Sequence, residues 1–196
     1  VAELAAVGES DVAEPRREAD MTDIVRVELR ALEARAARAG VEVHVRTVPD
    51  DPNARIVSRV APRLTAVMAR ELMAYAIAAT PRGHGVVVTV VAAGAPFDPH
   101  VAGVGAGNGL GVRIVVDDAG TILPASARRA LLALEVEPGT FGRPSSVALS
   151  IAAEIATAQG ALFELSDGPP QGATGERGSG GRGLGGGVRV VVTFPR

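Results

Sequence analysis

Apolar residues recur at the spacing of a helix in four stretches of the chain. The stretches are 21–39, 63–79, 125–134 and 145–159. Asp20 precedes the first and is a suitable N-cap, Gly40 follows it as a C-terminal glycine should, and Pro62 stands where the second should begin. The pattern therefore predicts four helices, and the apolar residues of 63–79 and 145–159 are expected to face the core.

Strand patterns separate these helices. Val41, Val43 and Val45 alternate with polar residues, which is typical of a half-buried strand. Further strands are predicted at 54–59, 85–93, 110–116, 161–165 and 188–194. Because the strands come in adjacent pairs with helices between the pairs, the order predicts an α+β fold. The expected architecture is a two-layer α/β sandwich, a mixed sheet with helices on one face.

The chain divides into a short leader and one domain. Residues 1–20 contain an apolar helical remnant and then a charged linker, and 21–196 contain all the predicted elements. The stretch at about 168–187 is dominated by glycine and shows no periodicity, so it is expected to be a disordered loop. The chain begins with Val1, and we expect it to be a fragment of a longer protein.

Composition and charge indicate which ligands and partners can be expected. Apolar residues make up 47% of 196 residues, enough for a packed core, and the formal net charge is −2. That charge gives no reason to expect nucleic acid, and no run reaches the roughly 18–20 apolar residues of a membrane span. The chain has no cysteine, and His44, His84 and His100 are scattered, so no metal site is expected from them.

Three local sequences stand at the joints between the predicted elements. Residues 71–80 read Glu-Leu-Met-Ala-Tyr-Ala-Ile-Ala-Ala-Thr, 118–124 read Asp-Ala-Gly-Thr-Ile-Leu-Pro, and 144–149 read Pro-Ser-Ser-Val-Ala-Leu. Together with the element order they resemble the asparagine box and the two glycine boxes of the GHKL, or Bergerat, fold. Within that fold they resemble the catalytic domain of bacterial sensor histidine kinases, over roughly residues 21–195.

The resemblance implies ligands, partners and a place in the cell. It implies ATP and Mg²⁺ as ligands, a response regulator or another signalling protein as partner, a homodimer formed through upstream helices, and a cytoplasmic location. It implies no direct membrane contact of this segment.

Some positions retain the residue that the family uses. Asp118 matches the carboxylate that accepts the adenine amino group, and Gly120 matches a glycine that lets the backbone approach the base. Glu71 matches the general base of ATP-hydrolysing relatives, with a solvated helix residue as the alternative. The alternative for 117–120 is a simple turn at the end of a strand.

Other positions depart from the family. Tyr75 stands where an asparagine would ligate Mg²⁺, and a neutral phenol is a poor ligand for this hard cation. Ile122 replaces the second glycine, and its β-branched side chain is expected to crowd the pocket. The glycines whose N–H groups would cradle phosphates are replaced by Pro144, Ser146 and Ala148. These departures argue against tight binding of ATP or Mg²⁺.

Two loops offer further candidates. Phe141 is the candidate for a lid residue over a nucleotide, with an apolar anchor to the core as the alternative. The glycine string at 103–111 resembles a phosphate cradle, but it leads into a strand and not a helix, so a hairpin loop is the favoured reading.

The favoured hypothesis is a two-component signalling domain with a degenerate nucleotide site, acting by regulation or partner binding with weak or no ATP turnover. Asp118 and Gly120 would form the floor of any remaining pocket, and Glu71, Tyr75 and Ile122 would lie beside it. One alternative is an active histidine autokinase domain with Glu71 as its catalytic residue. The other is a phosphotransfer or adaptor protein in which this domain only braces a helical bundle.

Overall fold

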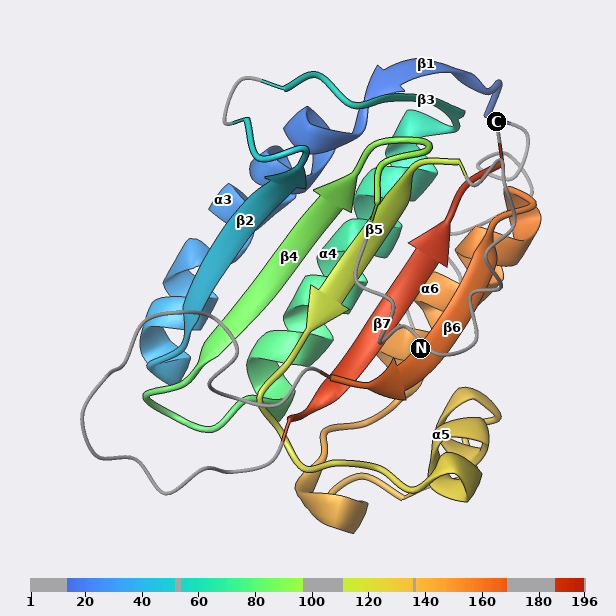
Figure 1. The fold of residues 1–196 in the computed structure, drawn as a ribbon. Coiled ribbons are helices and arrows are strands. Elements are labelled where there is room, and N and C mark those ends of the chain that lie inside the picture. Colours follow the sequence, from blue (N-terminus) through green and yellow to red (C-terminus); the bar gives the residue numbers. More distant parts are fainter. Residues whose placement is uncertain (1–13, 52–53, 97–110, 136, 169–185, 196) are drawn as a thin grey trace.

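The computed structural model describes residues 14–51, 54–96, 111–135, 137–168 and 186–195. The elements follow the chain in this order: β1 (Arg17–Asp20), α3 (Met21–Ala39), β2 (Glu42–Val48), β3 (Val57–Val60), α4 (Pro62–Ala79), β4 (Gly85–Val91), β5 (Arg113–Asp117), α5 (Ala125–Leu132), the 3₁₀ turn η1 (Thr140–Gly142), α6 (Val147–Ala158), β6 (Leu162–Asp167) and β7 (Val188–Thr193). Figure 1 shows them.

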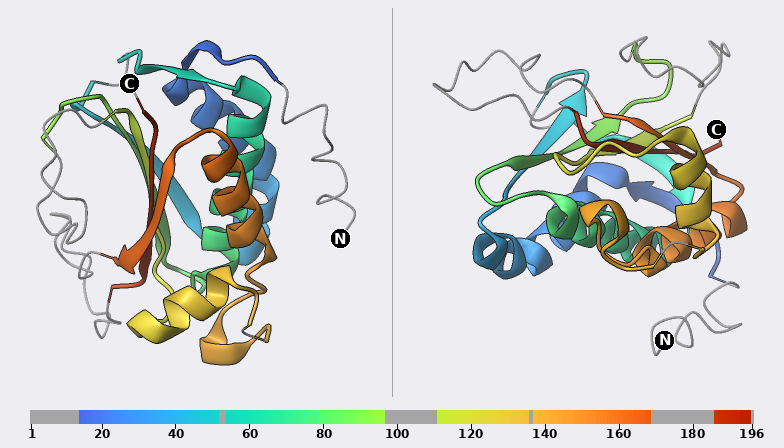
Figure 2. Two further views of the ribbon diagram at one scale, coloured as in Figure 1. Left: turned by 90° about the vertical axis from the view of Figure 1, so that its right-hand side faces the viewer. Right: turned by 90° about the horizontal axis from the view of Figure 1, so that it is seen from below.

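The main sheet has five strands in the order β2-β4-β5-β7-β6. Strand β2 runs parallel to β4, and every other neighbouring pair is antiparallel. Helices α3, α4 and α6 cover one face of this sheet, as the two views of Figure 2 show. The predicted two-layer α+β sandwich with a mixed sheet is therefore confirmed.

Alternation along the central strands divides the apolar residues between two faces. Val88, Ile114 and Val190 lie in the large cluster beneath the helices and are almost fully buried. Val115 and Val191 point the other way and belong to a second, smaller cluster. The two-residue period of a strand produces this division, and it brings the helix-facing side of β5 against α4.

The predicted helix boundaries of α3 and α4 rest on their terminal residues. The Asp20 side chain accepts hydrogen bonds from the backbone N–H groups of Thr22 and Asp23, and Gly40 takes the left-handed conformation with φ of 68°. Pro62 is the first residue of α4, where its missing N–H removes no helical hydrogen bond. The sequence signals at these three positions are confirmed.

The structure differs from the sequence prediction near the N-terminus, and it leaves some predicted segments outside the described residues. Residues 17–20, assigned to the linker, form β1, which pairs with β3 in a separate two-stranded sheet. His100 and most of the glycine-rich stretches at 103–111 and 168–187 lie outside the described residues. Among the residues that are described, no helix combines the length and apolarity needed to span a bilayer.

Candidate functional site

Asp118 occupies the first position after β5, at the end of the sheet that α5 approaches (Figure 1). Its backbone N–H donates to the carbonyl oxygen of Val188 at 3.0 Å, which ties the turn to β7. The N–H of the next residue, Ala119, donates to the hydroxyl of Thr80 at the end of α4. The predicted adenine-binding carboxylate is therefore held between the sheet and the C-terminal end of α4.

The Asp118 carboxylate is paired with the guanidinium of Arg143. Nη1 donates to Oδ2 at 2.7 Å and Nη2 donates to Oδ1 at 3.0 Å, so the pair is bidentate. Both side chains are almost fully buried, with 1% of Arg143 and 2% of Asp118 exposed. The carboxylate that the resemblance assigns to adenine thus already has an internal partner.

Backbone groups complete the surroundings of this pair. Asp118 Oδ1 also accepts from the N–H of Gly120 at 2.8 Å and of Val188 at 3.1 Å. Arg143 Nε donates to the carbonyl oxygen of Thr121 at 2.9 Å, and Nη2 donates to the same oxygen. Both oxygens of Asp118 and all three guanidinium nitrogens of Arg143 therefore have hydrogen-bond partners, which offsets the cost of burying the two charges.

Tyr75 packs beside the guanidinium from α4. The Cζ atom of Arg143 lies 6.0 Å from the centre of its ring, at the outer limit of a cation–π contact. The residue is 2% exposed, and its buried hydroxyl interacts with Arg143 but makes no hydrogen bond of normal geometry. The tyrosine that replaces the metal-ligating asparagine therefore contributes a ring face to this centre.

Electrostatics of the centre follow from burial and from the ion pair. Burial raises the pKa of Tyr75 above its ordinary value, and the charge of Arg143 opposes this only in part. For Arg143, burial alone would lower the pKa, but the hydrogen bond and charge of Asp118 outweigh it and raise the pKa. Tyr75 is therefore neutral and Arg143 charged near neutral pH.

Gly120 is required at its position by packing. A Cβ atom there would lie 2.5 Å from the carbonyl oxygen of Ala79 and 3.2 Å from Arg143 Nη2. No residue with a side chain fits without displacing the backbone of α4. The resemblance assigns this glycine to the close approach of a base. Here the same glycine lets α4 and Arg143 approach the turn.

The remaining predicted residues do not join the buried pair. Glu71 lies one turn before Tyr75 on α4 and is half-buried. Ile122 is 47% exposed and Phe141 44% exposed. That Ile122 crowds a nucleotide pocket stays a prediction, although nearly half of the residue is exposed. Phe141 is no core anchor.

The start of α6 carries no glycine cradle. Ser146 is the N-cap residue, but its side chain makes no capping hydrogen bond. In the first turn of α6, the N–H of Val147 donates to the hydroxyl oxygen of Ser145 at 3.4 Å. Pro144 has no N–H to offer. The N–H groups of the first helical turn remain, but no glycine stands here to let a phosphate approach them closely.

The residues present do not fit Mg²⁺ and ATP. A nucleotide base would have to compete with Arg143 for both oxygens of Asp118, and the position of the metal-ligating amide holds the ring of Tyr75. Magnesium prefers hard oxygen ligands in octahedral geometry, and the buried phenol stands in place of one. The cradle glycines are absent as well.

Sequence reasoning missed Arg143. The residue lies next to Pro144, between the helices predicted at 125–134 and 145–159, and contacts a carboxylate 25 positions earlier in the chain. A contact between a loop and a strand end leaves no periodic signal. The sequence offered one hint, which is that an arginine directly precedes the segment that resembles the second glycine box.

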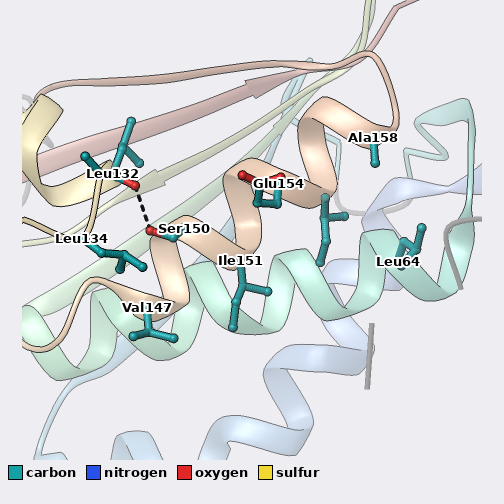
Figure 3. A pocket seen from close by; sticks show the side chains of 10 residues that line it. Leu64, Leu132, Leu134, Val147, Ser150, Ile151, Glu154 and Ala158 are labelled. Carbon is teal, nitrogen blue, oxygen red and sulfur yellow. Dashed lines mark hydrogen bonds between the residues drawn. The ribbon is translucent and has the colours of Figure 1, made fainter. Parts of the chain in front are cut away.

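A groove of about 470 Å³ lies elsewhere, along α4, α6 and the end of α5. Figure 3 shows that Val147, Ile151 and Leu134 border it, with the Ser150 hydroxyl donating to the carbonyl oxygen of Leu132 at 3.0 Å. None of the predicted nucleotide-site residues lines this groove. It is therefore separate from the Asp118 centre.

Comparison with known proteins gives a structural likeness without a sequence match. No family model and no curated protein matches the chain. The mycobacterial sensor histidine kinase MprB superposes with a TM-score of 0.64 at 15% identity, over 92% of this chain and 97% of that one. The catalytic domain of histidine kinase ThkA gives 0.62 at 15% identity, over 92% and 95%.

A third structure places the fold within a larger protein. Full-length ShkA in complex with AMPPNP superposes with a TM-score of 0.61 at 19% identity, over 92% of this chain but 31% of ShkA. This chain thus corresponds to about a third of that kinase. Because these superpositions extend over nearly the whole of both chains, this chain has the fold of the catalytic domain of histidine kinases.

Proposed function

We propose that this chain is a signal-transduction domain of the two-component, histidine-kinase type whose nucleotide site is degenerate. It acts by regulation or by binding a protein partner, with weak or no ATP turnover. Its fold supports the kinase-type signalling role. The buried pairing of Arg143 with both oxygens of Asp118 is the observation that carries the degenerate reading.

The energetic argument starts from what a base would displace. Adenine is neutral, so placing its amino group on Asp118 would leave the Arg143 guanidinium buried without its counter-ion. Breaking a buried pair in this way typically costs about 3–5 kcal/mol. This cost reduces the net free energy of binding ATP, and without the phosphate cradle few contacts remain to offset it.

The same structure bears on the catalytic alternative. An active autokinase would need the metal and the triphosphate in order to stabilise the charge that develops during phosphoryl transfer. Tyr75 at the metal position and Pro144 at the cradle argue against both. Retention of Asp118 and Gly120 is the observation that favours the alternative, but both residues serve internal packing here.

The partners in this proposal are a response regulator or another signalling protein in the cytoplasm, with dimerisation through helices upstream. An adaptor role, in which the domain braces a histidine-bearing helical bundle, would use the same fold. A longer parent sequence with such a bundle would favour the adaptor role over direct regulation.

Titration calorimetry with Mg-ATP tests the proposal. We expect a dissociation constant above roughly 1 mM, which corresponds to a binding free energy weaker than about −4 kcal/mol. ShkA, whose structure holds AMPPNP, is a suitable positive control. A micromolar dissociation constant that depends on Mg²⁺ would refute the proposal and favour the autokinase.

A further inference from the structure

The centre around Asp118 has the chemistry of a receptor for a planar cation. We propose that it is a guanidinium-binding site whose resident ligand is the Arg143 side chain, and that this internal ligand has replaced adenine. The inference concerns the same site as the proposed function and rests on it for the statement that nucleotide no longer binds there. It adds the class of ligand for which the site is built.

The carboxylate matches the fork of a guanidinium. Its two oxygens accept from Nη1 and Nη2 of Arg143 at 2.7 and 3.0 Å. This parallel arrangement is specific to a planar group with two terminal nitrogens, and a lysine ammonium cannot reproduce it. The geometry therefore selects for shape as well as charge.

A backbone carbonyl serves the other edge of the same group. Thr121 oxygen accepts from Arg143 Nε at 2.9 Å and also from Nη2. Together with the carboxylate, these contacts use donors on all three nitrogens of the guanidinium. The unsubstituted ring nitrogens of adenine accept hydrogen bonds, so they cannot donate to this carbonyl as the guanidinium does.

Tyr75 supplies a third element of recognition. Its ring lies 6.0 Å from Arg143 Cζ, and a tyrosine face attracts a cation. The asparagine that the family carries at this position would offer an amide instead. The replacement that removes a metal ligand therefore also adds a surface suited to a guanidinium.

Ligand replacement in an arginine-free variant tests the inference. Arg143→Ala removes the side chain beyond Cβ, and ethylguanidinium restores the missing atoms. At about 20 mM, ethylguanidinium should raise the melting temperature of R143A by roughly 2–4 °C relative to equal ethylammonium, which carries the charge without the fork. Adenosine at the same concentration should have no effect.

The controls isolate the site. Wild-type protein has no vacancy, and Arg55→Ala removes an exposed arginine whose Nε lies 3.2 Å from Asp20. Neither should respond to ethylguanidinium differently from ethylammonium. If folded R143A gains nothing from ethylguanidinium, or gains from adenosine instead, the inference is overturned. These outcomes are independent of the wild-type Mg-ATP titration, which tests the proposed function.

A measurement on wild-type protein covers the case in which R143A does not fold. Hydrogen exchange of arginine Nε–H groups, followed by NMR, should show strong protection at Arg143, because Nε is bonded to the Thr121 carbonyl in a buried centre. Arg129, an exposed residue of α5, serves as the reference. Equal exchange rates at the two residues would contradict the inference.

Discussion

Replacing Asp118 by asparagine changes one oxygen of the buried pair and almost nothing else in size. Oδ1 accepts three hydrogen bonds, from Gly120, Val188 and Arg143, whereas Oδ2 accepts one from Arg143 Nη1. The amide oxygen of asparagine should therefore take the place of Oδ1. Its NH₂ group then faces Nη1, donor against donor, and the guanidinium loses its counter-charge.

The expected cost is large compared with ordinary substitutions. Both side chains are almost fully buried, so water cannot replace the lost interaction, and removal of one partner of such a pair costs about 3–5 kcal/mol. Domains of this size are typically stable by about 5–15 kcal/mol. D118N should therefore still fold, but with much of its stability lost.

Urea unfolding followed by circular dichroism measures this cost, with the slope checked for two-state behaviour. Asp167→Asn is the matched control, because Asp167 pairs with Arg128 at 2.5 Å but is 60% exposed, and exposed pairs contribute about 0–1 kcal/mol. Adding Arg143→Met to D118N should recover at least about 1 kcal/mol, since the uncompensated cation then leaves. A cost for D118N below about 1 kcal/mol would refute the buried pair.

Two further predictions concern Tyr75 and Gly120. Tyr75→Phe should change stability near neutral pH by less than about 1 kcal/mol, because the hydroxyl makes no hydrogen bond of normal geometry. Burial raises the pKa of Tyr75 above 10.0, so the fold holds this proton more tightly than the unfolded chain and stability falls as pH rises above about 10. Urea unfolding at about pH 8 to 11 should show that Y75F loses less stability with rising pH than the wild type. The chain has a single tyrosine, so its tyrosinate absorbance reports Tyr75 directly and should titrate above 10.0. A midpoint at or below 10.0 would contradict the burial of Tyr75 beside Arg143. Gly120→Ala should cost about 1–3 kcal/mol by urea unfolding, because its Cβ would lie 2.5 Å from the Ala79 carbonyl oxygen. Gly83→Ala is the control, because nothing lies near its Cβ and its φ of 83° leaves only the cost of backbone strain.

The elements were predictable where local physics fixes them. Two-residue alternation produced the strands, helical spacing produced α3, α4 and α6, and Asp20, Gly40 and Pro62 marked the boundaries. Strand β1 was missed because Arg17 to Asp20 is polar with no alternation, and only its pairing with β3 makes it a strand. Such a strand depends on partner residues 37 to 43 positions away, which no local pattern shows.

The candidate site was predictable in part. Asp118, Gly120 and Tyr75 were singled out, and all three lie together. What the sequence could not supply was the loop arginine, because the approach of Arg143 to Asp118 depends on how the α5–α6 connection folds back against the turn after β5.

A crystal of the chain soaked with a non-hydrolysable ATP analogue and Mg²⁺ tests the central claim most directly. The account predicts that Arg143 stays on both oxygens of Asp118, that the Tyr75 ring remains beside it, and that no base is bound between α4 and β5. An adenine amino group on Asp118, with Arg143 turned away and a magnesium-bound triphosphate at the start of α6, would contradict it.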